Sequence, residues 1–333
     1  MSEQQVQKVS APKPGRLLAA DARLGTALRY TVLLAALGSI SILAGFETAR
    51  RTVPQPAPDS TARPQTNSAA LRPAGMPSSE KNVDAEISRL APQEQAARLL
   101  QRALDGDEAS LNVLREKADG WRGRLQNTDR LFDLVLAALN SHDLRVRTAA
   151  VDLDLAANNL SKSPESVSRL LAQLQRDPSE RGMALWRLGS LGNRGVQPDR
   201  VLESLVKYAH DRNEHTRYWA VEGLAMLGID AAVDPLLDRL AHDPSTRVRE
   251  RAASGLGQSG LLTREERLAA VPDLLNLTDD DSLGTTTREL VYGTLRVITG
   301  AALGNDANAW RAWWANHDPA NEKPKRATHL LQA

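Results

Sequence analysis

The chain has 333 residues and no cysteine, and its 42 basic residues almost balance its 41 acidic ones. The lack of cysteine excludes disulfides, thiol nucleophiles, cysteine-ligated metals and a lipid anchor attached to cysteine. Aromatic residues make up only 4% of the chain, while Ala, Leu and Arg dominate. Because β-sandwiches and barrels use more aromatic and β-branched residues, this composition predicts an all-α fold.

The first predicted element is a transmembrane helix at residues 30–46. This segment contains no charged residue, and at about 1.5 Å per residue its length is at the short end of what spans a bilayer. Arg29 precedes it, and Arg50 and Arg51 follow it, so basic side chains are available at both membrane interfaces. A cleaved signal peptide is the alternative, but the preceding segment is long and no Ala-x-Ala cleavage pattern follows the apolar run.

The charges around this segment predict its orientation. Five basic residues precede it and three follow it closely, which favours a cytoplasmic tail at residues 1–29. The rest of the chain would then lie on the periplasmic side of a bacterial inner membrane. Residues 47–80 contain six prolines between polar residues, and this composition predicts a disordered linker.

From residue 128 onward the sequence repeats. Five segments align on an arginine near the start of the second helix of a helical pair, and successive arginines are 34, 36, 32 and 39 residues apart. A spacing in this range is typical of stacked helical pairs. The arginines are Arg147, Arg181, Arg217, Arg249 and Arg288. An aspartate precedes each of them, and we expect it to cap the second helix or to pair with an arginine of its own or a neighbouring repeat.

The fourth of these units is the clearest, and residues 236–253 read LLDRLAHDPSTRVRERAA. This segment resembles a HEAT repeat of the bacterial lyase HEAT-like type, and the resemblance extends over residues 128–303. It implies an α-solenoid of about five helical pairs, whose second helices line a concave face that binds partners. The solenoid would be flanked by an N-terminal helical cap at 81–127, a Trp-rich C-terminal cap at 304–320 and a flexible tail at 321–333.

Aligning the second helices on their arginines predicts a candidate partner-binding face. In the fourth unit Val248, Ala252 and Leu256 set the buried stripe, so the positions between them point away from it. Six residues fall at such outward positions, and large aromatic residues there are typical interface anchors. They are Trp186, Tyr218, Glu222, Glu250, Ser254 and Glu289. For Trp186 the alternative is packing between repeats.

His–Asp dipeptides are the main candidates for chemistry, and they occur at 142–143, 210–211, 242–243 and 317–318. The first three fall at equivalent turns, where a helix end and the next N-cap explain them better than a shared metal does. The His–Glu pairs of HEAT-like di-iron hydroxylases are absent, and so are a phosphate-binding loop and a nucleophile elbow. We therefore expect no enzyme activity, cofactor, metal site or small-molecule substrate.

The last tryptophans, Trp310, Trp313 and Trp314, share one helical segment. They would cover the open apolar end of the last repeat, as a solenoid requires, with a Trp-lined binding site as the alternative. Residues 81–333 carry 33 basic and 36 acidic residues, a net charge of −3, which argues against nucleic acid as a partner.

The sequence as a whole predicts a membrane-anchored protein–protein interaction scaffold with an unknown protein partner. A non-catalytic regulatory subunit of a membrane enzyme or transporter complex is the alternative. A lyase or a nucleic-acid-binding HEAT-like protein is less favoured.

The predicted anchor leads to a direct test. The full-length protein should sediment with membranes and be released by detergent but not by high salt, because residues 30–46 would lie in the hydrocarbon core. Deleting residues 1–50 should leave a soluble helical domain, and a reporter fused after Ala333 should be exported. Recovery of the full-length protein in the soluble fraction would contradict the anchor.

Overall fold

The computed structural model describes residues 78–317 of the chain. The predicted tail at 1–29, transmembrane segment at 30–46 and tail at 321–333 lie outside the described residues. Among the helices of residues 78–317, none has the length and apolar character needed to cross a membrane. The first described helix begins at Ser78, so the end of the segment 47–80 expected as linker is helical.

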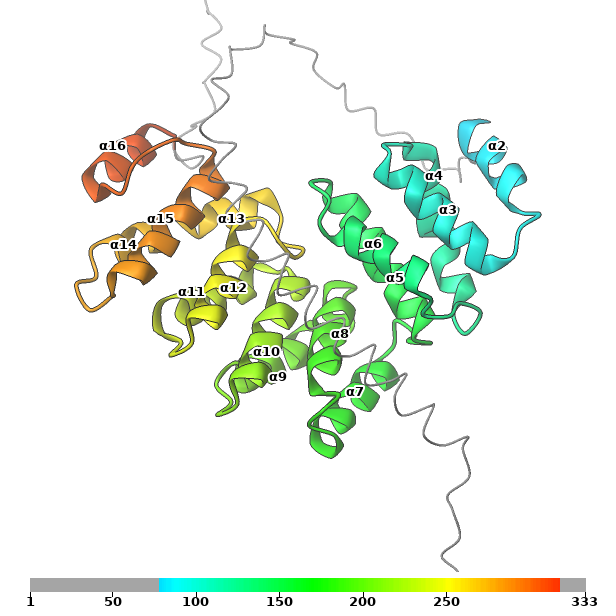
Figure 1. The fold of residues 1–333 in the computed structure, drawn as a ribbon, viewed down its shortest axis with the longest axis horizontal. Helices are drawn as coiled ribbons and strands as arrows, with labels where there is room; N and C mark the ends of the chain where they lie inside the picture. The colour runs from blue at the N-terminus through cyan, green and yellow to red at the C-terminus, as the bar shows by residue number, and fades with distance from the viewer. Residues whose placement is uncertain (1–77, 318–333) are drawn as a thin grey trace, which may run out of the picture.

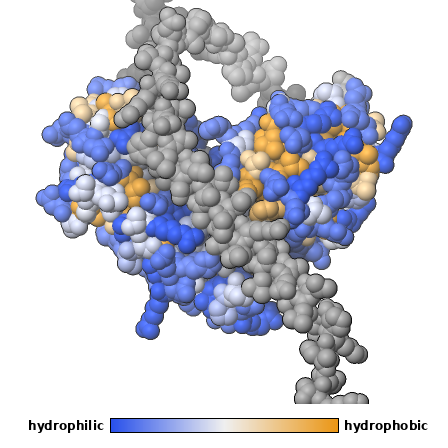
Figure 2. Space-filling model, viewed as in Figure 1, coloured by the Kyte–Doolittle hydropathy of each residue, from blue (hydrophilic) through white to orange (hydrophobic). Residues whose placement is uncertain are grey.

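Every regular element in residues 78–317 is a helix, which confirms the predicted all-α fold. The helices follow one another along an arch, with α2 and α16 at its two ends (Figure 1). Hydrophilic residues cover most of the visible face, and hydrophobic ones gather mainly over the arm that holds α4 and α6 (Figure 2).

The arch begins with an N-terminal helical unit, followed by five helical pairs. The N-terminal unit consists of α2 (Ser78–Ile87), α3 (Pro92–Leu104), α4 (Glu108–Lys117) and the short 3-10 helix η1 (Ala118–Trp121). The first helices of the pairs are α5 (Asp129–Leu139), α7 (Pro164–Arg176), α9 (Pro198–Ala209), α11 (Val233–His242) and α14 (Val271–Thr278). The second helices are α6 (Leu144–Ala157), α8 (Arg181–Asn193), α10 (Glu214–Leu227), α12 (Thr246–Gly257) and α15 (Thr285–Thr299).

Three further elements complete the described residues. The 3-10 helix η2 (Asp230–Ala232) precedes α11, α13 (Arg264–Ala269) lies between the fourth and fifth pairs, and α16 (Ala307–His317) ends the arch. In α16 the indole of Trp310 is fully buried and donates a hydrogen bond to the carbonyl of Gly304 at 2.8 Å. Trp313 and Trp314 pack half-buried against the same core. The last helix therefore covers the end of the apolar core.

First and second helices bury different shares of their surfaces. A first helix such as α7 buries one stripe, formed by Val167, Leu170 and Leu174, and leaves its other side in solvent. Proline at the start of α7 and α9 suits the first helical turn, where its missing N–H costs nothing. In contrast, every residue of α10 from Thr216 to Leu227 is buried. The second helices are therefore enclosed from several sides.

The aspartates before the second helices act in two ways. Asp143 is the N-cap of α6, and its carboxylate accepts a hydrogen bond from the backbone N–H of Arg145, as predicted. Asp177, Asp211 and Asp243 also accept from the backbone N–H two residues further along, but each of them precedes the N-cap residue of its second helix. These three carboxylates close the turn ahead of the helix and do not cap the helix itself.

Two apolar cores lie along the arch, and they meet in α6. The N-terminal core includes Leu153 of α6 and extends back to Val83. The C-terminal core includes Val151 and Leu155 of the same helix and extends to Trp310. Helix α6 thus has one side in each core, which is why it is almost continuously buried from Val146 to Ala156. We call residues 78–157 the N-terminal arm and residues 164–317 the C-terminal arm.

Backbones of neighbouring second helices come into direct contact at Gly189 of α8 and Gly223 of α10. A Cβ placed on Gly189 would lie 2.0 Å from the carbonyl oxygen of Gly223. A Cβ on Gly223 would lie 2.7 Å from the carbonyl oxygen of Leu185. Only glycine allows this approach, because any side chain would force the two helices apart.

Substituting Gly189 by alanine should therefore lower the free energy of unfolding by about 3 kcal/mol, since the added methyl group meets backbone and not a movable side chain. Urea denaturation followed by circular dichroism measures this change. Gly120→Ala is the control, because a Cβ there meets no atom within 4 Å, and it should leave stability unchanged or slightly higher. Equal stabilities for the two variants would show that the helices can separate at little cost.

Candidate functional site

The structure places four of the six predicted interface residues in the interior. Trp186, Tyr218, Glu222 and Ser254 each expose only 3–4% of their surface, so the prediction that they face a partner is wrong. Glu250 is half-buried. Glu289 is the sixth, and it is exposed on α15. The six residues therefore do not form one accessible surface.

Long arginine side chains of the fourth pair cover the third pair. The guanidinium of Arg247 lies over the ring of Tyr218, 4.4 Å from its centroid. Arg251 forms an ion pair with Glu222, with Nε 2.6 Å from Oε1, and both side chains are at least 94% buried. The extended arginines of α12 thus occupy the space that a partner was expected to fill.

Trp186 of α8 packs towards the N-terminal arm, which was the alternative for this residue. It lines a narrow fissure of about 10 Å³ together with Phe132, Leu136 and Met183. A cavity of this volume is about the size of one water probe. Trp186 is therefore a packing residue between α5 and α8.

The buried ionic groups alter the protonation behaviour of the interior. Burial and the nearby charge of Glu222 raise the pKa of Tyr218 to about 12, so its phenol stays neutral. Burial by itself would lower the pKa of Arg251, but the carboxylate of Glu222 outweighs burial and raises that pKa. The face formed by second helices such as α10 and α12, which we call the inner face of the arch, therefore holds Glu222 and Arg251 as a charged pair.

A hydrogen bond between the two arms spans the inner face of the arch. Arg147 of α6 is 6% exposed, and its Nη1 donates to the carbonyl of Gln258, which follows α12, at 2.7 Å. Arg251 donates to the hydroxyl of Ser259 at 2.7 Å, and Arg267 donates to the carbonyl of the same residue at 3.1 Å. Burial and the charge of Arg147 lower the pKa of Arg267 to about 10. Three arginines therefore donate hydrogen bonds to the turn after α12, and one of them, Arg147, comes from the N-terminal arm.

The repeated arginines make one strong link between repeats. Arg217 is bound to Asp243 of the next pair through Nε at 2.8 Å and Nη2 at 3.0 Å, and the carboxylate is fully buried. This confirms the predicted pairing of an arginine with the aspartate of a neighbouring repeat. Arg249 is half-buried and donates to the backbone carbonyl of Asp243 at 2.6 Å. Arg288 is 3.7 Å from Asp281, whose carboxylate is exposed.

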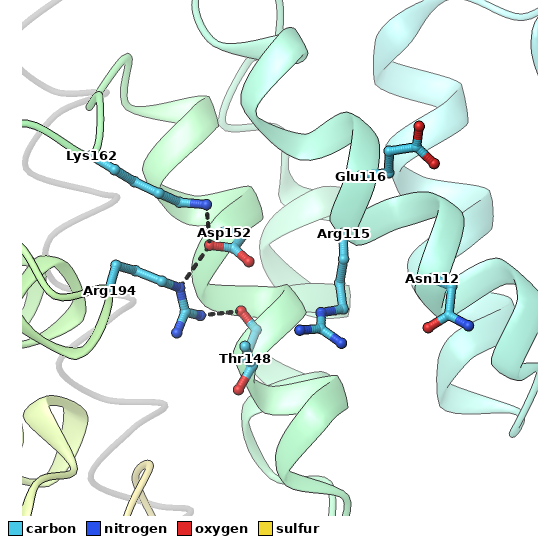
Figure 3. A pocket seen from close by; sticks show the side chains of 7 residues that line it. All are labelled: Asn112, Arg115, Glu116, Thr148, Asp152, Lys162 and Arg194. Carbon is cyan, nitrogen blue, oxygen red and sulfur yellow. Dashed lines mark hydrogen bonds and ion pairs between the residues drawn. The ribbon is translucent and has the colours of Figure 1, made fainter. Parts of the chain in front are cut away.

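An open polar cavity lies where the two arms meet, and we call it the junction cavity (Figure 3). Its volume is about 460 Å³, which is within the usual range for ligand sites. It is bounded by α4, α6, the loop after α6 and the loop after α8. The lining residues are Asn112, Arg115, Glu116, Thr148, Asp152, Lys162 and Arg194.

Asp152 of α6 organises the floor of this cavity. Its side chain is 7% exposed and accepts Nε of Arg194 at 2.8 Å, with Nζ of Lys162 at 3.2 Å. Arg194 also donates through Nη2 to the carbonyl of Thr148 at 2.6 Å. These interactions connect α6 to two loops of the C-terminal side, and all of them are visible as dashed lines in Figure 3.

A second carboxylate of α6 strengthens the same junction. Asp154 is 4% exposed and pairs with Nε of Arg187, on α8, at 3.3 Å. Sequence reasoning missed both carboxylates and their partners. The available signal was the pattern Val-Asp-Leu-Asp-Leu at 151–155, because an acidic residue inside a buried helix requires a cationic partner.

The histidines of the first three His–Asp dipeptides lie at the surface of the arch. His142, His210 and His242 are exposed. The rings of His210 and His242 are 3.8 and 3.1 Å from the carboxylate of Asp238. Across residues 78–317 no three histidine or acidic side chains are grouped so that they could hold a metal ion. The fourth dipeptide extends to Asp318, outside the described residues.

The stacked helical pairs define a helical-repeat solenoid. Residues 167–257 match the family of HEAT repeats, a segment that runs from α7 to the end of α12. This match supports a HEAT-repeat protein and agrees with the resemblance seen in the fourth unit. No curated protein matches the chain.

The two arginines near Asp243 should differ in their contribution to stability. Arg217→Ala leaves a fully buried carboxylate with Arg239 as its remaining cation, at 3.5 Å, and should cost about 3 kcal/mol. Arg249→Ala removes hydrogen bonds at a half-buried site and should cost about 1 kcal/mol. Urea denaturation of the two variants measures the difference. Equal losses would mean that Arg239 alone compensates the charge of Asp243.

Proposed function

We propose that the protein is a membrane-anchored scaffold that binds a protein partner through the surface of its helical arch. The observation that carries this proposal is the stack of helical pairs matched to HEAT repeats over residues 167–257. Such solenoids expose extended surfaces to which partners bind. The protein would then act by binding a partner of complementary shape and charge, without making or breaking a covalent bond.

The anchor in this proposal is the uncharged segment at 30–46, supported by its length and its flanking arginines. The excess of basic residues before it supports a periplasmic position for the arch, at the inner membrane of a bacterium. A linker of the composition found at 47–80 would let the arch move away from the bilayer surface. The scaffold would then act on partners near the membrane.

The described surface favours the junction cavity as the contact region. The middle of the inner face is covered by Arg247 and Arg251, whereas the cavity is open and polar. The net charge of −3 in residues 81–333 supports a protein partner over nucleic acid, because a polyanion would be repelled at long range.

Cross-linking in intact cells followed by purification of the tagged full-length chain tests this function. We expect a defined protein to co-purify in a reproducible ratio, and nuclease treatment should not release it. The chain lacking residues 1–50 is the matched control, and it should capture less because it is no longer concentrated at the membrane.

Two outcomes would contradict the scaffold. One is purification of the full-length chain alone under cross-linking conditions that trap known complexes in the same cells. The other is nuclease-sensitive capture, which would indicate nucleic acid. The identity of a captured protein also separates a scaffold from a regulatory subunit of a membrane enzyme or transporter.

A further inference from the structure

The cations that line the junction cavity differ in how they are paired. Three cationic side chains line it, Arg115, Lys162 and Arg194, against two carboxylates, Glu116 and Asp152. The cationic ends come from three different elements and point towards the same space, whereas Glu116 points away from it (Figure 3). Lys162 is paired with Asp152 and with Asp119, each 3.2 Å from its Nζ, and Arg194 is bound to Asp152, so the positive charge left open to solvent is that of Arg115.

Arg115 carries this open charge. Within residues 78–317 it forms no ion pair or hydrogen bond through its side chain, and it is exposed. Lys117 and Arg145 of the same arm are paired, with Asp84 at 2.6 Å and with Glu108 at 2.7 Å, whereas other exposed arginines of the arm, such as Arg122, do not line the cavity. Arg115 thus points an unpaired guanidinium across the cavity.

Arg194 on the opposite side is held in place before any ligand arrives. Its Nε binds Asp152, its Nη1 binds Asn193 and its Nη2 binds the carbonyl of Thr148. These bonds use three of the five guanidinium N–H groups, so two remain free. Its side chain is only 12% exposed, so binding an anion would cost little side-chain entropy.

We propose that the junction cavity binds a carboxylate side chain of an acidic segment in the protein partner, between Arg115 and Arg194. A guanidinium binds a carboxylate through charge-assisted hydrogen bonds. Arg115 is the one cation of the lining that has no ionic partner among residues 78–317, and a single carboxylate would neutralise it. This inference rests on the proposed scaffold function and names the chemistry of its partner.

The same charges argue against larger anions. Glu116 and Asp152 lie beside the cations, so a dianionic phosphate would meet about twice the repulsion that a single carboxylate meets. An apolar ligand would make few favourable contacts in the cavity, because the lining side chains are all polar or charged.

The test measures binding of short fluorescent peptides to the full-length chain in an uncharged detergent. One peptide contains two internal glutamates and a C-terminal amide, and its matched control replaces both glutamates by glutamine. A third peptide has the glutamine sequence with a free C-terminal carboxylate. Inorganic phosphate and a single-stranded oligonucleotide serve as competitors.

We expect the glutamate peptide to bind and its glutamine counterpart to bind at least about tenfold more weakly, as loss of a charge-assisted pair implies. Arg115→Glu should weaken binding of the glutamate peptide by about tenfold or more, whereas Arg115→Lys should retain part of the affinity. Arg122→Glu is the matched control, because Arg122 is exposed on the same arm and does not line the cavity. It should leave affinity within about twofold, and circular dichroism should be the same for all variants.

Several results would overturn the proposal. Equal binding of the glutamate and glutamine peptides, or no binding by either, would exclude carboxylate recognition. Equal losses in Arg115→Glu and Arg122→Glu would indicate general electrostatic attraction outside the cavity. Stronger binding of phosphate or the oligonucleotide, lost in Arg115→Glu, would assign the cavity to a phosphate ligand. Preference for the free C-terminus would replace the side chain by a terminal carboxylate.

This experiment is independent of the capture experiment. A partner that still cross-links to the Arg115→Glu chain would leave the scaffold in place and remove the cavity from its interface. If glutamate peptides bind the chain but no partner is captured, carboxylate binding in the cavity is supported and the scaffold function is contradicted.

Discussion

The approach of Gly189 to Gly223 sets how the second helices pack. Their backbones touch, so α8 and α10 lie too close together for a side chain to enter between them. The larger side chains of these helices must then point towards the first helices or over the neighbouring repeat. This explains why α10 is buried along almost its entire length. It also explains why few of its side chains are exposed for a partner to contact.

The two arms are joined in a different way, through charges. Asp152 and Asp154 lie in a helix shared by both apolar cores, and Arg194 and Arg187 reach them from the other arm. A buried carboxylate is costly unless it is paired and hydrogen-bonded, so these residues specify one position of the arms. Arg147 adds a third link, from α6 to the turn after α12. A ligand in the junction cavity that binds Arg115 and Arg194 would therefore contact both arms at once.

The failure of the predicted binding face has a definite cause. The alignment assumed that a second helix has one buried stripe, as Val248, Ala252 and Leu256 indicate for α12. In a stacked array such a helix also packs against the second helices on either side. The positions assigned to solvent at Tyr218 and Glu222 are covered by arginines of the next repeat. Because those contacts depend on the orientation of long side chains, the spacing of residues in the sequence does not reveal them.

The sequence by itself determined the helical class and the repeated pairs, and it limited the expected partner of Arg217 to the aspartate of its own or of a neighbouring repeat, because all of these follow from periodicity and from the spacing of residues. The tertiary structure decided which surface stays open. That outcome depends on how far neighbouring helices approach and on where Arg115, Lys162 and Arg194 meet. These three residues lie up to 79 positions apart in the chain, and no local pattern relates them. Only the packing of α4 and α6 against the loops of the next repeats brings their charges to one cavity.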